Sequence, residues 1–214
     1  MILYVNGDSH SLGAMKDKSI GQSFVDLIAD KFNLSVINQA DPASSASRII
    51  RTTREFFSKN DPKDIMVLIG WGTWEREEWE SNGKYYNVMQ DWYKHLPDEL
   101  LEKYNAWITS LTPDSIDEKS RSVHKEIYAL HQFLMKRNIP HLFFNCMYNF
   151  FGIKESEMVD WNNCYIGPYT NDLSYYWYLT NKHFESDHWY HFGADGHQAW
   201  ANVLINYIKE NNLL

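Results

Sequence analysis

The sequence predicts one α/β domain in which a central parallel sheet lies between two layers of helices. Short apolar runs alternate with segments of helical periodicity over most of the 214 residues, as at 2–5, 20–32 and 34–37. A strand, a helix and a second strand in this order form a unit whose strands pair in parallel. No repeat, low-complexity tract or linker divides the chain. We therefore predict a three-layer α/β/α sandwich over residues 1–214, with roughly four or five strands.

Each predicted element is bounded by turn or cap residues. Ser19 is the expected N-cap of the first helix and Asn33 its stop, and Asp61-Pro62 and Gly70 enclose the third strand. The predicted strands are 2–5, 34–37, 65–69 and 139–146. The predicted helices cover about 19–33, 122–137 and 194–209, and a further helix opens from the loop at 41–50 and runs to about 58. Residues 149–186 read as a loop-rich aromatic segment.

Residues 71–120 exceed the usual connection between a strand and the next helix. Asn82-Gly83 is a turn signal, the aromatic residues at 85–93 are spaced like one face of a helix, and 96–111 is a further helix that Thr112-Pro113 closes. We predict an insertion over the carboxyl edge of the sheet, either a lid or a contact surface. Its Trp and Tyr side chains either line a substrate groove or pack against the body.

The charge pattern excludes several classes of partner. The net charge is −8 and no Lys/Arg block stands out, so neither nucleic acid nor an anionic membrane surface is an expected partner. No apolar run approaches the ~20 residues that span a bilayer, and no leader pattern opens the chain, so the default expectation is a soluble, cytoplasmic protein. The two cysteines, Cys146 and Cys164, are too few for a disulfide framework, and Cys146 reads as a core residue. No cofactor is expected, and the sequence indicates no oligomeric state.

The aromatic content is high, at 16%, with 9 Trp and 14 Tyr. Their flat apolar faces with a polar tip suit surfaces that bind partners or sugar rings, but they also serve as core filler. Both interpretations stay open.

Ser9 is the first candidate for catalysis. The first strand stops at Asn6-Gly7, and Ser9 follows on the turn toward the next helix. Such a turn holds a side chain at the carboxyl edge of the sheet, where open α/β folds bind ligands. A serine there is either a nucleophile or an ordinary helix cap.

Histidines gather at the other end of the chain, where His183, His188, His191 and His197 accompany Asp187 and Asp195. The pairing of Gly7-Asp8-Ser9 with His191 and Gly196-His197 resembles the SGNH (GDSL-like) hydrolase superfamily, which has its serine after the first strand and its histidine before the last helix. The resemblance implies a flavodoxin-like strand order, a Ser9 nucleophile and His191 as general base.

The orienting carboxylate in that family stands three residues before the histidine, a position that His188 occupies here. Asp187 is one residue further back and can serve if the turn bulges; otherwise the site is a Ser-His dyad or inactive. His197 is interpreted as a structural residue of the helix start. A zinc site of His188, His191 and Asp187 or Asp195 is the alternative, but no HExxH or Cys-rich spacing supports it, so no metal is expected.

The oxyanion donors depart from the family pattern. The resemblance implies that the backbone amides of Ser9 and Ala43 donate hydrogen bonds to the oxyanion. Alanine keeps the N–H of the family's glycine but loses its freedom to take positive φ. The alternative role of this loop is a helix N-cap by Ser44 or Ser45. In that family, an asparagine side chain after the third strand is a further oxyanion donor. The corresponding stretch here, Gly70-Trp71-Gly72-Thr73, contains no asparagine. Gly72, Thr73 or Arg76 are possible substitutes, although Arg76 is also placed to pair with Glu75, Glu77 or Glu78. Asn145, at the end of a strand, is a further polar donor or else a turn residue.

The function these residues predict is hydrolysis of a small acyl ester through an acyl-enzyme on Ser9, with a small-molecule or glycan ester as substrate and O-acetylated carbohydrate favoured. The missing asparagine, Ala43 and the shifted Asp187 favour the alternative, a catalytically silent module of the same fold for carbohydrate binding or structural assembly.

Overall fold

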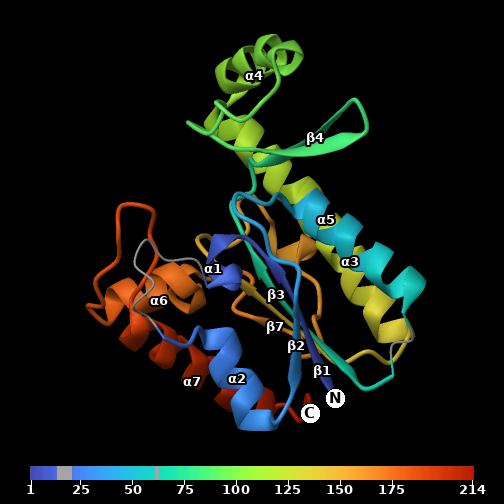
Figure 1. Ribbon diagram of the computed structural model, residues 1–214, viewed down its shortest axis with the longest axis vertical. Coiled ribbons are helices and arrows are strands. Elements are labelled where there is room, and N and C mark those ends of the chain that lie inside the picture. Colours follow the sequence, from blue (N-terminus) through green and yellow to red (C-terminus); the bar gives the residue numbers. More distant parts are fainter. Residues whose placement is uncertain (14–20, 61–62) are drawn as a thin grey trace.

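The computed structural model describes residues 1–13, 21–60 and 63–214, and its centre is a parallel sheet with strand order β2-β1-β3-β6-β7. Figure 1 shows this sheet edge-on between two groups of helices. The strands of the sheet are β1 (Ile2–Gly7), β2 (Ser35–Asn38), β3 (Ile65–Trp71), β6 (His141–Asn145) and β7 (Tyr165–Ile166). The helices are α1 (Ser9–Leu12), α2 (Phe24–Phe32), α3 (Ala46–Lys59), α4 (Asp98–Ser110), α5 (Pro113–Lys136), α6 (Tyr175–Asn181) and α7 (Ala194–Glu210). The predicted α/β/α sandwich and its flavodoxin-like order are confirmed.

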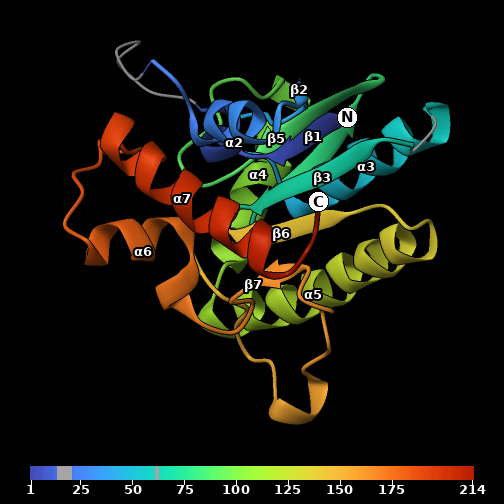
Figure 2. The ribbon, with the colours of Figure 1, turned by 90° about the horizontal axis from the view of Figure 1, so that it is seen from below.

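The two faces of the sheet bury separate cores because side chains alternate along each strand. In β1, Leu3 and Val5 pack with α2 and α7, whereas Tyr4 packs with α3 and α5 on the opposite face. Figure 2 shows α7 and α5 on either side of the strands. A central strand buried on both faces appears in the sequence as a continuous apolar run. This is why the inner strands β1, β3 and β6 could be predicted from the sequence.

The first long helix begins later than predicted. Ser23 caps α2 at Phe24, where its side chain accepts from the Asp26 amide and Asp26 accepts in return. Ser19, the predicted cap, and Ile20 lie outside the described residues, as do Asp61 and Pro62. Asn33 ends α2 in a left-handed conformation, as the sequence predicts.

The aromatic segment at 85–93 is not a helix. Residues Glu77–Ser81 (β4) and Lys84–Val88 (β5) form an antiparallel hairpin, and Asn82 and Gly83 both take positive φ at its turn. Trp79 lies opposite Tyr86, so the aromatic spacing serves cross-strand pairing instead. The hairpin and α4 share a small apolar cluster of Trp79, Val88, Leu96, Leu100 and Tyr104. They project together at one end of the molecule in Figure 1.

Helix α5 also begins earlier than predicted. Thr112 is its N-cap and Pro113 its first residue, whereas the sequence reading took this pair as the close of the preceding helix. Proline suits the first turn of a helix because the missing N–H would be unpaired there anyway. Residues 149–186 contain, besides loops, the edge strand β7, α6 and the short helical turns η2 (Glu155–Glu157) and η3 (Asn171–Leu173). No helix among the described residues is long and apolar enough to span a bilayer.

Candidate active site

Ser9 is the first residue of α1, directly after β1. Gly7 takes φ 149°, and a Cβ there would lie 2.7 Å from the Gly70 carbonyl, so only glycine allows this tight exit from the strand. Asp8 caps α1 through the His10 amide. The half-buried Ser9 hydroxyl thus stands at the carboxyl edge of the sheet on a rigid turn.

His191 comes from the segment before α7 and meets Ser9 across the chain. The His191 Nε2 and Ser9 Oγ atoms are 2.9 Å apart, and His191 Nδ1 lies 3.3 Å from Asp187 Oδ2. Asp187 and His191 are four residues apart, and a tight turn between them lets their side chains meet. In this turn Tyr190 takes φ 67° and its amide donates to the Asp187 carbonyl. The bulged turn brings Asp187, one residue earlier than the family position, to the imidazole.

The environment of His191 favours the neutral base. Burial lowers the pKa of His191, the nearby His10 lowers it further, and Asp187 opposes both. Asp187 stays ionised because the amides of His191 and Trp189 and the imidazole lower its pKa more than burial raises it. A neutral imidazole with Nδ1–H directed at Asp187 leaves Nε2 free to accept the Ser9 proton.

We expect the rate of covalent labelling of Ser9 by a serine-directed probe to remain high below pH 6.5, the ordinary pKa of histidine. Only neutral His191 can accept the proton, and its lowered pKa moves the acid limb of the pH–rate profile below that value. The labelling rate is measured by quenching the reaction at successive times and determining the intact mass, at pH values from about 4.5 to 8. A midpoint above 6.5 contradicts this account of the site.

Asp8 and Arg76 form a buried ion pair beside this triad. Asp8 is fully buried; its Oδ2 accepts from Arg76 Nη1 at 2.8 Å and its Oδ1 contacts His10 Nδ1 at 2.9 Å. Burial would raise the pKa of Asp8, but the charges and hydrogen bonds of His10 and Arg76 outweigh it and hold that pKa well below its usual range. The expected pairing of Arg76 with Glu75, Glu77 or Glu78 is therefore wrong.

The glutamates have other partners. Glu77 pairs with Lys119 and Glu78 with Arg51, while Glu75 accepts from the Thr73 hydroxyl at 2.6 Å. The sequence reading missed Asp8 and His10 as site residues, although both flank Ser9. Their adjacency to Ser9 was the available signal, and only the fold brings Arg76 to them.

Gly72 has no side chain and so leaves room for the Arg76 guanidinium beside Asp8. A Cβ at Gly72 would lie 2.6 Å from Arg76 Nη1 and 3.1 Å from Asp8 Oδ2, so a larger residue would displace the ion pair. Arg76 is 9% exposed, and its Nε has no hydrogen-bond partner among the described residues. Arg76 and Thr73 both line the cleft beside Ser9.

Ala43 adopts φ 61°, the conformation that the sequence reading considered lost to alanine. The left-handed region costs a non-glycine residue about 1–2 kcal/mol. Ser45 caps α3 immediately afterwards, as one of the two predicted caps, so the loop serves the helix start as well. In the part of the chain that the structure describes, neither the Ala43 amide nor the Ser9 amide has a hydrogen-bond partner.

Asn145 and His197 lie away from the reacting groups. Asn145 is fully buried at the end of β6, accepts from the Tyr165 hydroxyl at 2.5 Å and is not among the residues that line the cleft. This position corrects the prediction of a donor at the site. His197 is buried in the first turn of α7, accepts from the Phe24 amide, and burial lowers its pKa to about 4. The alternative zinc set around His191 is not brought together among the described residues.

An open cleft of about 610 Å³ leads to Ser9. Its walls include the turn after β1, the loop before α3, the segment after β5 and the turn that carries His191. The larger side chains that line it are Met89, Trp92, Tyr148, Trp189 and Tyr190. Trp92, Trp189 and Tyr190 are 38%, 47% and 47% exposed. The inserted region therefore contributes Trp92 to the cleft, while Trp79 and Tyr104 pack within the region itself rather than against the body.

A search of solved structures finds the same architecture. The psychrotrophic esterase EstA from Pseudoalteromonas sp. superposes with a TM-score of 0.50 at 10% identity, over 98% of this chain and 97% of that one. The chain therefore shares the fold of this esterase, an α/β/α sandwich around a central parallel sheet. A member of the lipolytic G-D-S-L family from Veillonella parvula gives a TM-score of 0.49 at 11% identity, over 98% of this chain and 97% of that one. A scan of the sequence against protein-family models and a search of curated proteins find no match.

In this fold, the residues before α7 and those after β1 meet at one edge of the sheet. This explains why Ser9 and His191 form a hydrogen bond across 182 positions of sequence. At 10% identity the likeness establishes the architecture, and what the site does is argued from its own residues.

Proposed function

We propose that this protein is a serine esterase that hydrolyses a small acyl ester through an acyl-enzyme on Ser9. The observation that carries the proposal is the chain of hydrogen bonds from Ser9 Oγ to His191 Nε2 and from His191 Nδ1 to Asp187, at 2.9 and 3.3 Å. A nucleophile, a base and an orienting carboxylate in this geometry activate a serine hydroxyl.

In the first step Ser9 Oγ attacks the ester carbonyl carbon while its proton passes to His191 Nε2. The tetrahedral intermediate collapses, and the alcohol leaves with the proton that His191 returns. Water then attacks the acyl-Ser9 ester and gives its proton to His191. The second tetrahedral intermediate collapses, His191 returns that proton to Ser9 Oγ, and the carboxylic acid leaves. Asp187 accepts from His191 Nδ1–H throughout and stabilises the imidazolium that forms.

The unpaired amides of Ser9 and Ala43 are the proposed oxyanion donors. Loss of one oxyanion donor typically costs about 10²–10³ in rate, so the missing asparagine calls for a replacement. Arg76 is the better supported substitute because its guanidinium lines the cleft and stays charged. The Thr73 hydroxyl already donates to Glu75.

Fluorophosphonate labelling of the purified protein, read by intact mass, tests the proposal. We expect one adduct on the wild type and none on Ser9→Ala. The exposed Ser122 on α5 provides the control, so Ser122→Ala should label like the wild type. A folded wild type that remains unlabelled would instead favour the silent binding module.

O-acetylated carbohydrate is the proposed substrate class. Three exposed aromatic side chains at the cleft, Trp92, Trp189 and Tyr190, offer flat faces to sugar rings. The net charge of −8 disfavours polyanionic substrates.

Trp189→Ala should raise KM for an acetylated oligosaccharide about three- to tenfold and leave kcat/KM for a small aryl acetate unchanged, since an aromatic contact contributes roughly 0.5–1.5 kcal/mol. Steady-state hydrolysis of both substrates measures the difference. Tyr85→Ala is the matched control because Tyr85 is 55% exposed on β5 and does not line the cleft. Equal effects of Trp189→Ala on both substrates would exclude a sugar-stacking role.

A further inference from the structure

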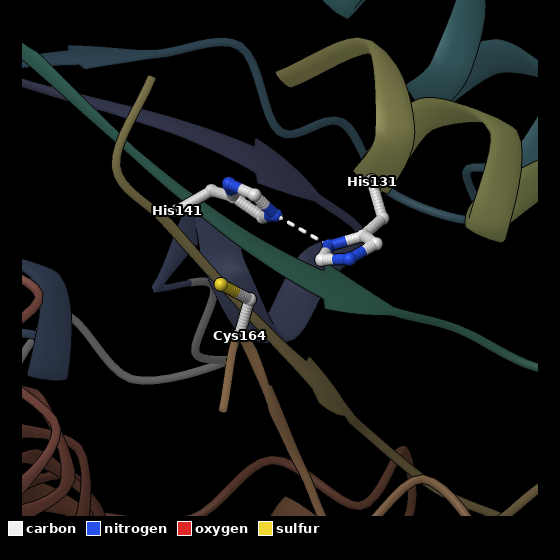
Figure 3. A group of neighbouring side chains, drawn as sticks. All are labelled: His131, His141 and Cys164. Carbon is white, nitrogen blue, oxygen red and sulfur yellow. Dashed lines mark hydrogen bonds between the residues drawn. The ribbon is translucent and has the colours of Figure 1, made fainter. Parts of the chain in front are cut away.

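A second group of chemistry-bearing side chains lies at the edge of the sheet opposite the catalytic site. His131 on α5, His141 at the start of β6 and Cys164 just before β7 are all buried, and one ligand atom of each lies within 4.8 Å of the others (Figure 3). Ser9 follows the carboxyl end of β1, whereas His141 opens its parallel strand β6. The catalytic mechanism uses none of these three residues.

The outer partners of the two histidines fix where their protons lie. His141 Nδ1 is 2.9 Å from the Ile139 carbonyl, which can only accept, so Nδ1 carries the proton and Nε2 a lone pair. When His131 Nε2 donates to Asn162 Oδ1, 3.3 Å away, the lone pair lies on His131 Nδ1. Carbonyl partners of this kind hold metal-binding histidines in the tautomer that ligation needs.

The two lone pairs then point at each other. His131 Nδ1 and His141 Nε2 are only 2.8 Å apart, the pair joined by the dashed line in Figure 3. In one tautomer of His131 its Nδ1–H donates to His141 Nε2; in the other, a metal ion can bind between the two lone pairs. Both rings are no more than 2% exposed, so the two nitrogens are shielded from bulk water. Neither ring forms an ion pair with a carboxylate among the described residues.

We propose that His131, His141 and Cys164 bind one Zn²⁺ ion in a structural site. Two imidazoles and a thiolate are preferred zinc ligands, with Zn–N of about 2.0–2.1 Å and Zn–S of about 2.3 Å, and water takes the fourth position. Tetrahedral ligation would place the two nitrogens about 3.3 Å apart, so the rings need to separate by roughly 0.5 Å. The thiol of Cys164 loses its proton to solvent as the Zn–S bond forms.

The ion would link α5 to β6 and β7, which already pair in parallel through backbone hydrogen bonds. α5 covers one face of the sheet, β6 is an inner strand, and β7 is a short edge strand of two residues. Aromatic rings surround the cluster, with Tyr128 and Trp161 at 5.7 and 5.5 Å from the His131 ring. This aromatic shell separates the cluster from bulk solvent.

Metal content of the tag-free protein after incubation with Zn²⁺ and dialysis is the first measurement. We expect about one Zn²⁺ per wild-type chain, and loss of it in Cys164→Ser and His131→Gln. His124→Gln is the matched control, because His124 is buried on the same helix and contacts the Tyr169 hydroxyl at 2.9 Å, outside the cluster. Zinc content that falls equally in His124→Gln would overturn the assignment.

Co²⁺ provides a readout of ligation that does not depend on activity. Wild-type protein should show a thiolate-to-Co²⁺ charge-transfer band, which Cys164→Ser removes and Cys146→Ser retains. The second comparison matters because Asp8, His10 and Cys146 form the other cluster of ligand atoms among the described residues. A band that depends on Cys146 instead, or no Co²⁺ or Zn²⁺ binding by the folded wild type, refutes the proposal.

Asn162→Gly separates ligation from folding. Asn162 takes φ 50°, which glycine tolerates, so the variant removes the amide without straining the loop. Because all three ligands remain, we expect zinc to bind about 10–100-fold more weakly, the usual effect of losing an outer hydrogen bond. Unchanged zinc affinity would contradict the proposed tautomer of His131.

Discussion

His191→Ala should lower kcat for ester hydrolysis about 10⁴- to 10⁶-fold, because removal of the base leaves the Ser9 hydroxyl un-ionised at neutral pH. Asp187→Asn should cost about 10⁴-fold, since an amide in place of the carboxylate no longer fixes the Nδ1–H tautomer. Steady-state hydrolysis of an aryl acetate by each purified variant, with circular dichroism to confirm folding, measures both effects.

His188→Ala is the informative control. His188 occupies the position at which the family has its aspartate, yet it is exposed and contacts the Trp189 ring rather than His191. We therefore expect less than a tenfold change in kcat. If Asp187→Asn leaves kcat intact while His191→Ala abolishes it, the site acts as a Ser-His dyad. If none of the variants changes the rate, the hydrolase mechanism is wrong.

Asp8→Asn should lower the free energy of unfolding by about 3–5 kcal/mol at pH 7, the usual result of removing one partner of a buried ion pair. The variant leaves the Arg76 guanidinium buried without its 2.8 Å counter-charge, and also weakens the contact with His10. Urea unfolding of the wild type and the variant measures the difference.

Lys119→Gln is the comparison at the surface. Lys119 pairs with Glu77 at 2.5 Å, but its side chain is 34% exposed, so solvent screening reduces the expected effect to about 0–1 kcal/mol. Similar unfolding midpoints for Asp8→Asn and Lys119→Gln would mean that the buried pair contributes no more than a surface pair.

The Asp8 contribution also has a defined pH dependence. Its pKa in the folded protein lies below the ordinary value of 3.8, so the ionised form stabilises the fold above that pH. The stabilisation is lost as the pH falls below 3.8 and the unfolded state takes up the proton first. Asp8→Asn should therefore flatten the acid side of the stability curve.

The sequence alone determined the layers of this protein. Strands buried on both faces leave continuous apolar runs, and amphipathic helices between them leave a 3.6-residue period, so the sandwich was predictable. Ser9 was also predictable, because it follows the first strand at the carboxyl edge of the sheet, whereas His191 and Asp187 were assigned from the resemblance to the SGNH hydrolases.

Elements outside the repeating pattern depended on tertiary structure. The aromatic residues at 85–93 fit a helix in isolation, but the Asn82-Gly83 turn pairs Tyr86 with Trp79 and makes a hairpin. Thr112 and Pro113 begin α5 rather than closing α4, which ends at Ser110.

Electrostatic partners were decided by the fold alone. Arg76 has three glutamates beside it in sequence, yet pairs with Asp8, 68 positions away, because Gly72 leaves room for the guanidinium at a buried carboxylate. The same holds for His131, His141 and Cys164, which have no motif spacing and meet only where α5, β6 and β7 are packed together. Burial makes such contacts strong, and burial is a property of the assembled layers rather than of any local segment.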